Sequence, residues 1–157
     1  MPATHQFSES NLTEVVQDGI ANLNFGSVDD HELNTTTYPI TRGQSSFEKY
    51  LRCKFSDTFT EISNMKFWRS DVLGYKTGET LKAAANVAFA TPSATPNADS
   101  NIPLNEGASL AIQSAAGTTT ITAPGYTKYM RLQLQTTGST PSGSVFQKTL
   151  TFQYDEV

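Results

Sequence analysis

The sequence predicts an all-β protein, an antiparallel β-sandwich of jelly-roll-like type. Several segments alternate apolar and polar residues, which is typical of a strand with one face in a core and the other in water. Strand candidates follow one another at intervals of roughly a dozen residues, as in sandwiches and barrels. Helix signals are scarce. A chain of 157 residues is long enough to form one domain with a core of its own.

The first nineteen residues are predicted to form an N-terminal arm or a short helix outside the sandwich, which would then occupy residues 20–157. Asn11 is a possible helix cap because Glu14 follows it three residues later. An extended arm from Pro2 to Asn11 is the alternative. The segment "IANLNFGSV" follows, and the shared phase of Leu23 and Phe25 predicts the first strand of the sandwich.

Two strands are predicted in the next third of the chain. In "FEKYLRCKFS" the residues Leu51, Cys53 and Phe55 are in phase and should point inward. In "ISNMKFWRS" Met65 and Phe67 share one face, and Lys66 and Trp68 share the other. Cys53 is therefore interpreted as a small buried apolar residue, and as the single cysteine it cannot form a disulfide within the chain.

The segment "GETLKAAANVAFA" has alanines that favour a helix by propensity. Its odd positions from Leu81 to Phe89 are all apolar, however, so a strand is favoured. A proline-rich loop from Thr91 to Pro103 follows, and it is expected to be a surface excursion. A short strand is predicted in "SLAIQSA".

The end of the chain predicts a β-hairpin. In "KYMRLQLQ" and in "KTLTFQYDEV" apolar and polar residues alternate, and the turn-forming residues 136–143 stand between the two segments. Together with the earlier segments, this predicts a core that contains Leu51, Phe55, Met65, Phe67, Leu132, Leu134, Leu150 and Phe152.

Charge and hydropathy exclude several classes of function. The formal net charge is −4 and the basic residues are scattered, whereas a nucleic-acid-binding protein needs a clustered positive face. No apolar stretch approaches the roughly 20 residues that span a bilayer. The first residues lack the basic and apolar regions of a signal peptide. We therefore expect no nucleic-acid or membrane partner and synthesis in a cytoplasm.

The residues give no pattern of catalytic, cofactor-binding or metal-binding chemistry. Residues Asp29 to Glu32 read "DDHE", but they lack the spacing and the glycine of a calcium-binding EF-hand loop, so solvated loop charge is favoured. The glycines have no phosphate-binding spacing, and no serine stands in a nucleophile elbow. We expect no enzyme activity, no cofactor and no metal.

Three aromatic residues are the candidate interface. Tyr50 and Tyr129 fall on the polar phase of their strands, as does Trp68. Exposed rings on a sandwich can anchor a protein partner or stack on a sugar. The alternative is that these rings lie beneath a loop or a second layer of the same chain.

The sequence also resembles a family. The succession "NFGSVD", "SFEKYLRCKF", "MKFW" and "LTFQYDE" resembles small structural proteins of tailed bacteriophages and prophages. The resemblance implies a virion component, most often one that decorates or cements the capsid and commonly a trimer. The major capsid protein or another virion protein would be its partner. A decoration protein needs a stable sandwich and a partner surface rather than chemistry.

Two functions are therefore carried forward. The first is a capsid decoration or cement protein in the virion, a homo-oligomer whose N-terminal arm and proline-rich loop become ordered on docking. The second is a tail or baseplate component with a carbohydrate-binding sandwich, which would use Trp68 or tyrosines as a platform for sugar rings.

Overall fold

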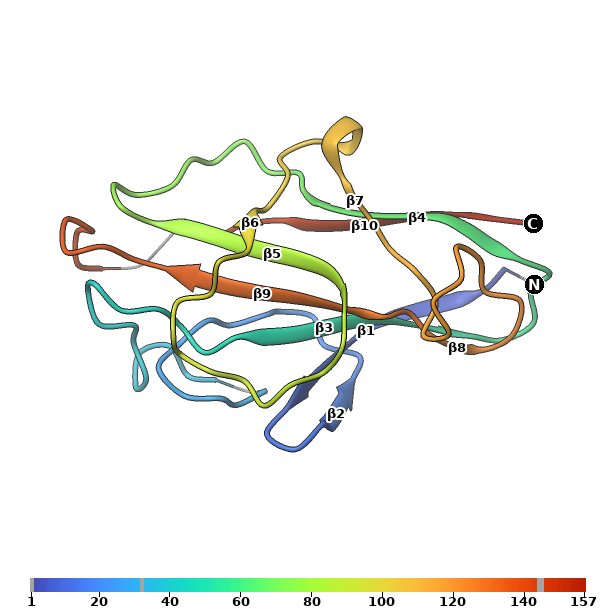
Figure 1. The fold of residues 1–157 in the computed structure, drawn as a ribbon, viewed down its shortest axis with the longest axis horizontal. Coiled ribbons are helices and arrows are strands. Elements are labelled where there is room, and N and C mark those ends of the chain that lie inside the picture. Colours follow the sequence, from blue (N-terminus) through green and yellow to red (C-terminus); the bar gives the residue numbers. More distant parts are fainter. Residues whose placement is uncertain (1, 32, 144–145) are drawn as a thin grey trace.

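The computed structural model describes residues 2–31, 33–143 and 146–157 as two packed antiparallel sheets (Figure 1). One short 3₁₀ helix, η1 (Glu106–Ala108), interrupts the described strands. The strands are β1 (Thr4–Asn11), β2 (Val15–Asp18), β3 (Lys49–Ser56), β4 (Ile62–Arg69), β5 (Thr80–Val87), β6 (Ser100–Asn101), β7 (Leu110–Ala111), β8 (Gly125–Tyr126), β9 (Tyr129–Gln135) and β10 (Leu150–Glu156).

The larger sheet has the strand order β2-β1-β3-β9-β5-β6, with β8 paired to one end of β3. The smaller sheet has the order β10-β4-β7. All these pairings are antiparallel. Between β3 and β5 the chain passes to the smaller sheet and back, and between β9 and β10 it crosses again. This alternation agrees with the predicted jelly-roll-like sandwich.

The core lies between the two sheets, and most of its predicted members are confirmed. Leu51, Phe55, Met65, Phe67, Leu132 and Leu134 are all buried. Leu150 and Phe152 are only half-buried, although both pack against the core. The reason is that β10 is an edge strand of the smaller sheet, paired to β4 alone among the described strands.

The first nineteen residues are not an arm or a helix, which corrects the sequence prediction. β1 pairs with β3 from Thr4 to Ser10, and β2 folds back to pair with the second half of β1. The extended arm gains a partner because the free edge of β3 satisfies its backbone groups. The sandwich therefore begins at Thr4 rather than at residue 20.

The segment "IANLNFGSV" is not a strand. Residues 20–28 are irregular, but Leu23 and Phe25 still turn their side chains toward the core. The phase of the two residues therefore predicted their burial and not their backbone pairing. The strand predicted in "SLAIQSA" is present only as the two residues of β7.

The closing hairpin is also absent. β9 lies between β3 and β5, so both of its edges are already paired. β10 pairs instead with β4 in the other sheet, with Phe152 opposite Phe67. Residues 136–149 thus carry the chain from one sheet to the other.

β5 is a strand, as the alternation predicted, and it contains a bulge. Its register with β9 shifts between Ala84 and Val87, where Asn86 has a φ of 59°. Asparagine tolerates this left-handed conformation better than most residues. The Asn86 amide donates to the carbonyl of Ala111 at 2.8 Å and accepts from the Gln113 backbone N–H at 2.7 Å. The bulge therefore ties the larger sheet to the strand β7 of the smaller one.

Replacing Phe67 by alanine should cost about 3–5 kcal/mol of unfolding free energy, because Phe67 is fully buried and the vacated volume becomes a cavity. Phe152→Ala should cost clearly less, since its ring is already half-exposed. Urea denaturation of the two variants and the parent protein measures both values. Equal losses of unfolding free energy would show that the position of Phe152 on an edge strand does not reduce the cost of removing its ring.

Cys53 should be inert in the folded protein. Its side chain is fully buried, and burial raises the pKa of the Cys53 thiol to about 12. The reactive thiolate is therefore scarce at neutral pH. A chromogenic disulfide reagent at about pH 8 should react with the thiol only after urea is added. Rapid labelling without denaturant would contradict this placement.

Candidate functional site

The three aromatic residues of the candidate interface are buried within their own chain. Tyr50 is 0% exposed, Tyr129 6% and Trp68 9%. Phe89 lies over the larger sheet with its ring centroid 5.0 Å from Tyr50 and 5.7 Å from Tyr129. The expectation of exposed rings is therefore wrong. For Tyr50 and Tyr129 the alternative of a covering loop is confirmed, because the loop after β5 covers the outer face of the larger sheet. Trp68 lies on β4 of the smaller sheet and is buried there.

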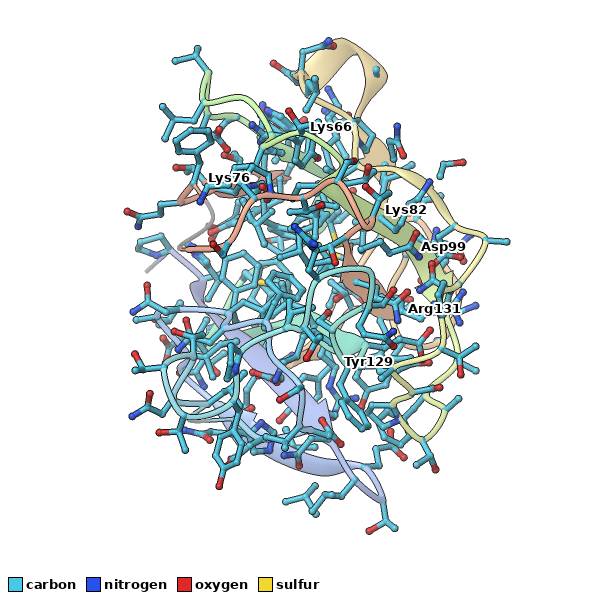
Figure 2. The ribbon with its side chains drawn as sticks, turned by 90° about the vertical axis from the view of Figure 1, so that its left-hand side faces the viewer. Lys66, Lys76, Lys82, Asp99, Tyr129 and Arg131 are labelled. Carbon is cyan, nitrogen blue, oxygen red and sulfur yellow. The ribbon has the colours of Figure 1, made fainter. Side chains whose placement is uncertain are left out.

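The proline-rich loop is fixed by polar side chains of β9. Arg131 makes a two-pronged ion pair with Asp99, at 2.6 and 2.9 Å (Figure 2). The Gln133 amide donates to the carbonyls of Ser93 and Thr95. The loop between Thr91 and Pro103 thus has its order within this chain, so the expectation that it orders only on docking is wrong. The hydrogen bond to Asp99 also raises the pKa of Arg131.

A buried ion pair joins β1 to β3. The Lys49 Nζ lies 2.7 Å from Glu9 Oε1, and both side chains are almost fully buried. Lys49 also donates to the backbone carbonyl of Asp30 at 2.7 Å. Burial raises the pKa of the Glu9 carboxyl, an effect that the charge of Lys49 opposes. The pair holds residues 29–31 against the sheet.

The acidic segment that follows Val28 folds onto this pair. His31 Nδ1 lies 3.9 Å from Glu9 Oε1, and its Nε2–H donates to the carbonyl of Val15. Asp29 accepts from the backbone N–H of Leu12 at 2.7 Å. Among the described residues, no group of three His, Cys, Asp or Glu residues is arranged to hold a metal ion. Glu32, the last member of "DDHE", lies outside the described residues.

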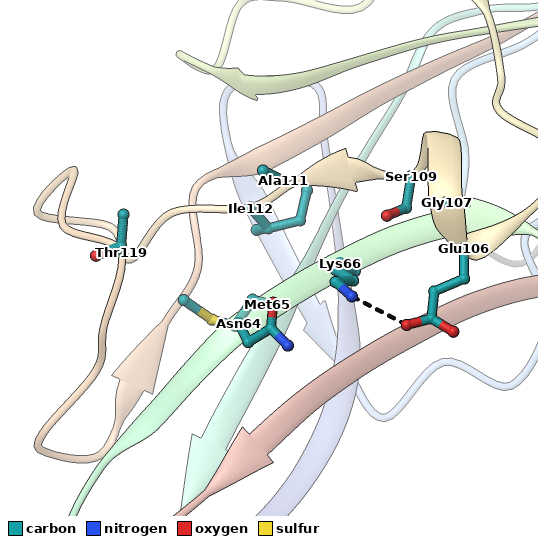
Figure 3. A pocket seen from close by; sticks show the side chains of 9 residues that line it. All are labelled: Asn64, Met65, Lys66, Glu106, Gly107, Ser109, Ala111, Ile112 and Thr119. Carbon is teal, nitrogen blue, oxygen red and sulfur yellow. Dashed lines mark hydrogen bonds and ion pairs between the residues drawn. The ribbon is translucent and has the colours of Figure 1, made fainter.

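A hollow of about 620 Å³ with a mixed polar and apolar lining lies on the smaller sheet beside η1 (Figure 3). The Lys66 Nζ projects across it and meets Glu106 Oε1 at 2.9 Å. Because these two charges neutralise each other, neither is free for a ligand of opposite sign. Asn64 and Ser109 supply further polar groups to the rim.

A larger groove, here called the end groove, opens at one end of the sandwich. Its volume is about 880 Å³. Core leucines of the larger sheet form its floor, residues from the irregular segment 20–25 form one wall, and residues 140–143 and 146–150 form the other. The apolar side chains that line the groove include, among the described residues, Phe7, Ile20, Leu23, Phe25, Leu51 and Leu134.

The charged residues of the end groove are both basic. Arg42 is exposed and has no side-chain partner among the residues that the structure describes. Lys148 also lines the groove, but its Nζ is paired to Glu79 at 2.5 Å. No carboxylate is among the described lining residues. The groove therefore combines an apolar floor with one free cation.

A convex apolar surface, here called the hairpin tip, lies at the turn between β1 and β2. Leu12 is 53% exposed, Val15 51% and Val16 38%. Leu12 and Glu14 have φ angles of 51° and 67°, a conformation that is unfavourable for such residues. The turn keeps this conformation because side chains from elsewhere in the chain bind it.

A second convex apolar surface, here called the upper loops, lies at the end of β4. Val72 is fully exposed, and Leu73 and Leu104 are about half-exposed. The backbone N–H of Arg69 donates to the carbonyl of Pro103, which brings the two loops together (Figure 1). Sequence reasoning missed the groove and the upper loops because each combines segments that are far apart in the chain, and it missed the tip because these residues were expected to form an arm or a helix.

No helix in the described part of the chain is long and apolar enough to cross a membrane. No family model, curated protein or solved structure matches the chain. The likeness to phage structural proteins therefore depends on the quoted sequence segments alone.

Removing one member of the buried ion pair should destabilise the fold strongly. Lys49→Met leaves the Glu9 carboxylate buried without its cation, which should cost about 3–5 kcal/mol near neutral pH. The double variant Glu9→Gln/Lys49→Met should recover a large part of the loss. Chemical denaturation of the three proteins measures these differences.

The same loss should shrink as the pH falls. The folded pKa of Glu9 lies above its ordinary value of 4.5, so the folded state binds this proton more readily than the unfolded state. Stability from this group is present at low pH and decreases as the pH rises through the folded pKa. Without Lys49 the folded pKa of Glu9 rises further. The Lys49→Met protein should therefore lose the most unfolding free energy, relative to the parent protein, at neutral pH. A loss independent of pH would contradict this.

Proposed function

We propose that the chain is a structural protein of a virion, most specifically a decoration or cement protein that binds a capsid shell without chemistry of its own. The observation that carries the proposal is the apolar surface of the upper loops. A fully exposed valine next to two half-exposed leucines is a surface that gains free energy when a protein partner covers it. The resemblance to phage structural proteins suggests which partner that is.

The upper loops are held in place before any partner binds. Arg69 makes two hydrogen bonds of 2.8 Å to Asp71, and both side chains are largely buried. Asp71 also accepts from the backbone N–H groups of Leu73 and Thr149. Burying Val72 against a partner therefore requires little further ordering of the loop, which favours affinity.

A shell with many identical sites suits a small surface of this kind. Three apolar side chains give a modest contact per copy. A homo-oligomer that engages several neighbouring sites at once multiplies that contact through avidity. The decoration role therefore needs both a surface toward the shell and a way of linking copies.

The carbohydrate-binding alternative lacks the platform that the sequence suggested. Trp68 and the two tyrosines, Tyr50 and Tyr129, are covered by other parts of the chain. A sugar ring would need an open aromatic face to stack on. The described structure therefore offers no open face on the three rings that the sequence suggested for this second function.

Binding to shells tests the proposal directly. Capsid shells of the encoding phage, prepared without this protein, should bind the purified chain and carry it through a density gradient. Val72→Asp should abolish or strongly reduce this binding, because a charge would be desolvated at the contact. Val157→Asp is the matched control, since Val157 is 75% exposed and lies near the chain termini, away from the upper loops (Figure 1).

Retention of Val72→Asp on the shells at the parental level would show that the upper loops are not the contact. A protein that ignores the shells and binds one defined glycan on an array would overturn the decoration role and favour the carbohydrate-binding alternative.

A further inference from the structure

We propose that copies of this chain associate head to tail, with the hairpin tip of one copy seated in the end groove of the next. The tip is convex and the groove is concave, and both present apolar side chains. Each copy carries both surfaces, so a chain of contacts can run from copy to copy. The inference concerns self-association and does not depend on whether the upper loops bind a capsid shell.

The hairpin tip is built as a rigid projection. Three side chains from other elements hold its backbone and its turn. Asp29 accepts from the N–H of Leu12 at 2.7 Å, His31 binds the carbonyl of Val15 at 3.1 Å, and the Tyr129 hydroxyl donates to Glu14 at 2.9 Å.

These contacts keep two residues in the left-handed region while Leu12 and Val15 face solvent. Unfavourable backbone conformations persist only where the surroundings impose them, and they are concentrated at functional sites. An exposed apolar turn that is held in this way is explained if a partner covers it.

Charge selects the end groove as the partner of the tip. The tip carries the exposed carboxylate of Glu14 between its apolar residues. The groove offers the free guanidinium of Arg42, and no carboxylate is among its described lining residues. A tip that enters the groove can therefore bury Leu12 and Val15 against the half-buried Leu23 and Phe25 of the groove wall and place Glu14 near Arg42 at the rim.

The two surfaces lie at different places on the molecule, so the contact is between unlike patches. The β1–β2 hairpin projects below the larger sheet, whereas the loop 136–143 that borders the groove lies at the end of the sandwich (Figure 1). Contacts between unlike patches produce closed rings when the rotation between copies closes, and open filaments when it does not. The trimer that the resemblance to phage structural proteins implies would be one such ring.

Sedimentation velocity tests the association. The parent protein should sediment as a defined oligomer at micromolar concentration. Val15→Asp at the tip and Arg42→Glu at the rim should each weaken association by about tenfold or more, toward a monomer. Val157→Asp should leave the oligomer unchanged. Circular dichroism and urea denaturation of each variant confirm that it is folded, which is expected because all three side chains are exposed.

Mixing the two defective variants separates a head-to-tail contact from a symmetric one. A Val15→Asp copy keeps an intact groove, and an Arg42→Glu copy keeps an intact tip. Their equimolar mixture should form a one-to-one dimer and nothing larger, since only one productive contact remains in each pair.

Glu14→Gln removes the charge but keeps an acceptor for the Tyr129 hydroxyl, so it should weaken association while the tip stays in place. A monomeric parent protein, an oligomer that survives Val15→Asp, or a mixture that stays monomeric would each overturn the proposal. Shell binding is measured separately through Val72→Asp. An oligomeric parent that ignores shells would therefore contradict the decoration role and leave head-to-tail association standing.

Discussion

The pairing of β1 with β3 is the contact on which the N-terminal third of the molecule depends. It places Glu9 beside Lys49, and this buried pair then holds the backbone at Asp30. The segment so held supplies Asp29 and His31, which fix the turn between β1 and β2. One strand pairing therefore positions a buried charge cluster, an irregular loop and the exposed hairpin tip. Because an unpaired charge at this depth is costly, the three features should form or be lost together.

The parts of the fold that could be predicted are those that local periodicity determines. β3, β4, β5 and β9 all contain an alternating stretch, and the inward residues of these stretches are the ones expected. Periodicity does not reveal which strand pairs with which. β9 and β10 are adjacent in sequence and both alternate, yet β9 already has β3 and β5 on its two edges. The N-terminal segment gave no strong strand signal because Phe7 is the one large apolar residue in β1, so apolar and polar residues do not alternate there.

Alternation alone could not predict the burial of the candidate interface, for a related reason. Tyr50 and Tyr129 occupy the polar phase of their strands, which is the solvent face of an uncovered sheet. Here the loop after β5 covers that face, held by Arg131 through Asp99 and by Gln133 through loop carbonyls. The signal was present in the sequence. A row of arginine and glutamine beside tyrosine on one strand offers donors for a covering loop, whereas the end groove depends on side chains from many separate segments of the chain.

The exposed apolar surfaces share one physical design, in which a polar network fixes a loop and leaves its apolar residues in water. Asp71, which is paired to Arg69, accepts a hydrogen bond from the backbone N–H of Leu73. Asp29 accepts one from the backbone N–H of Leu12. Such loops lose little conformational entropy on binding, so even small apolar contacts can contribute to affinity. The upper loops belong to the smaller sheet and the hairpin tip to the larger one. Under the two proposals, a copy uses one surface toward its neighbours and keeps the other free for a shell, a division of roles that a symmetric self-contact through the upper loops would not permit.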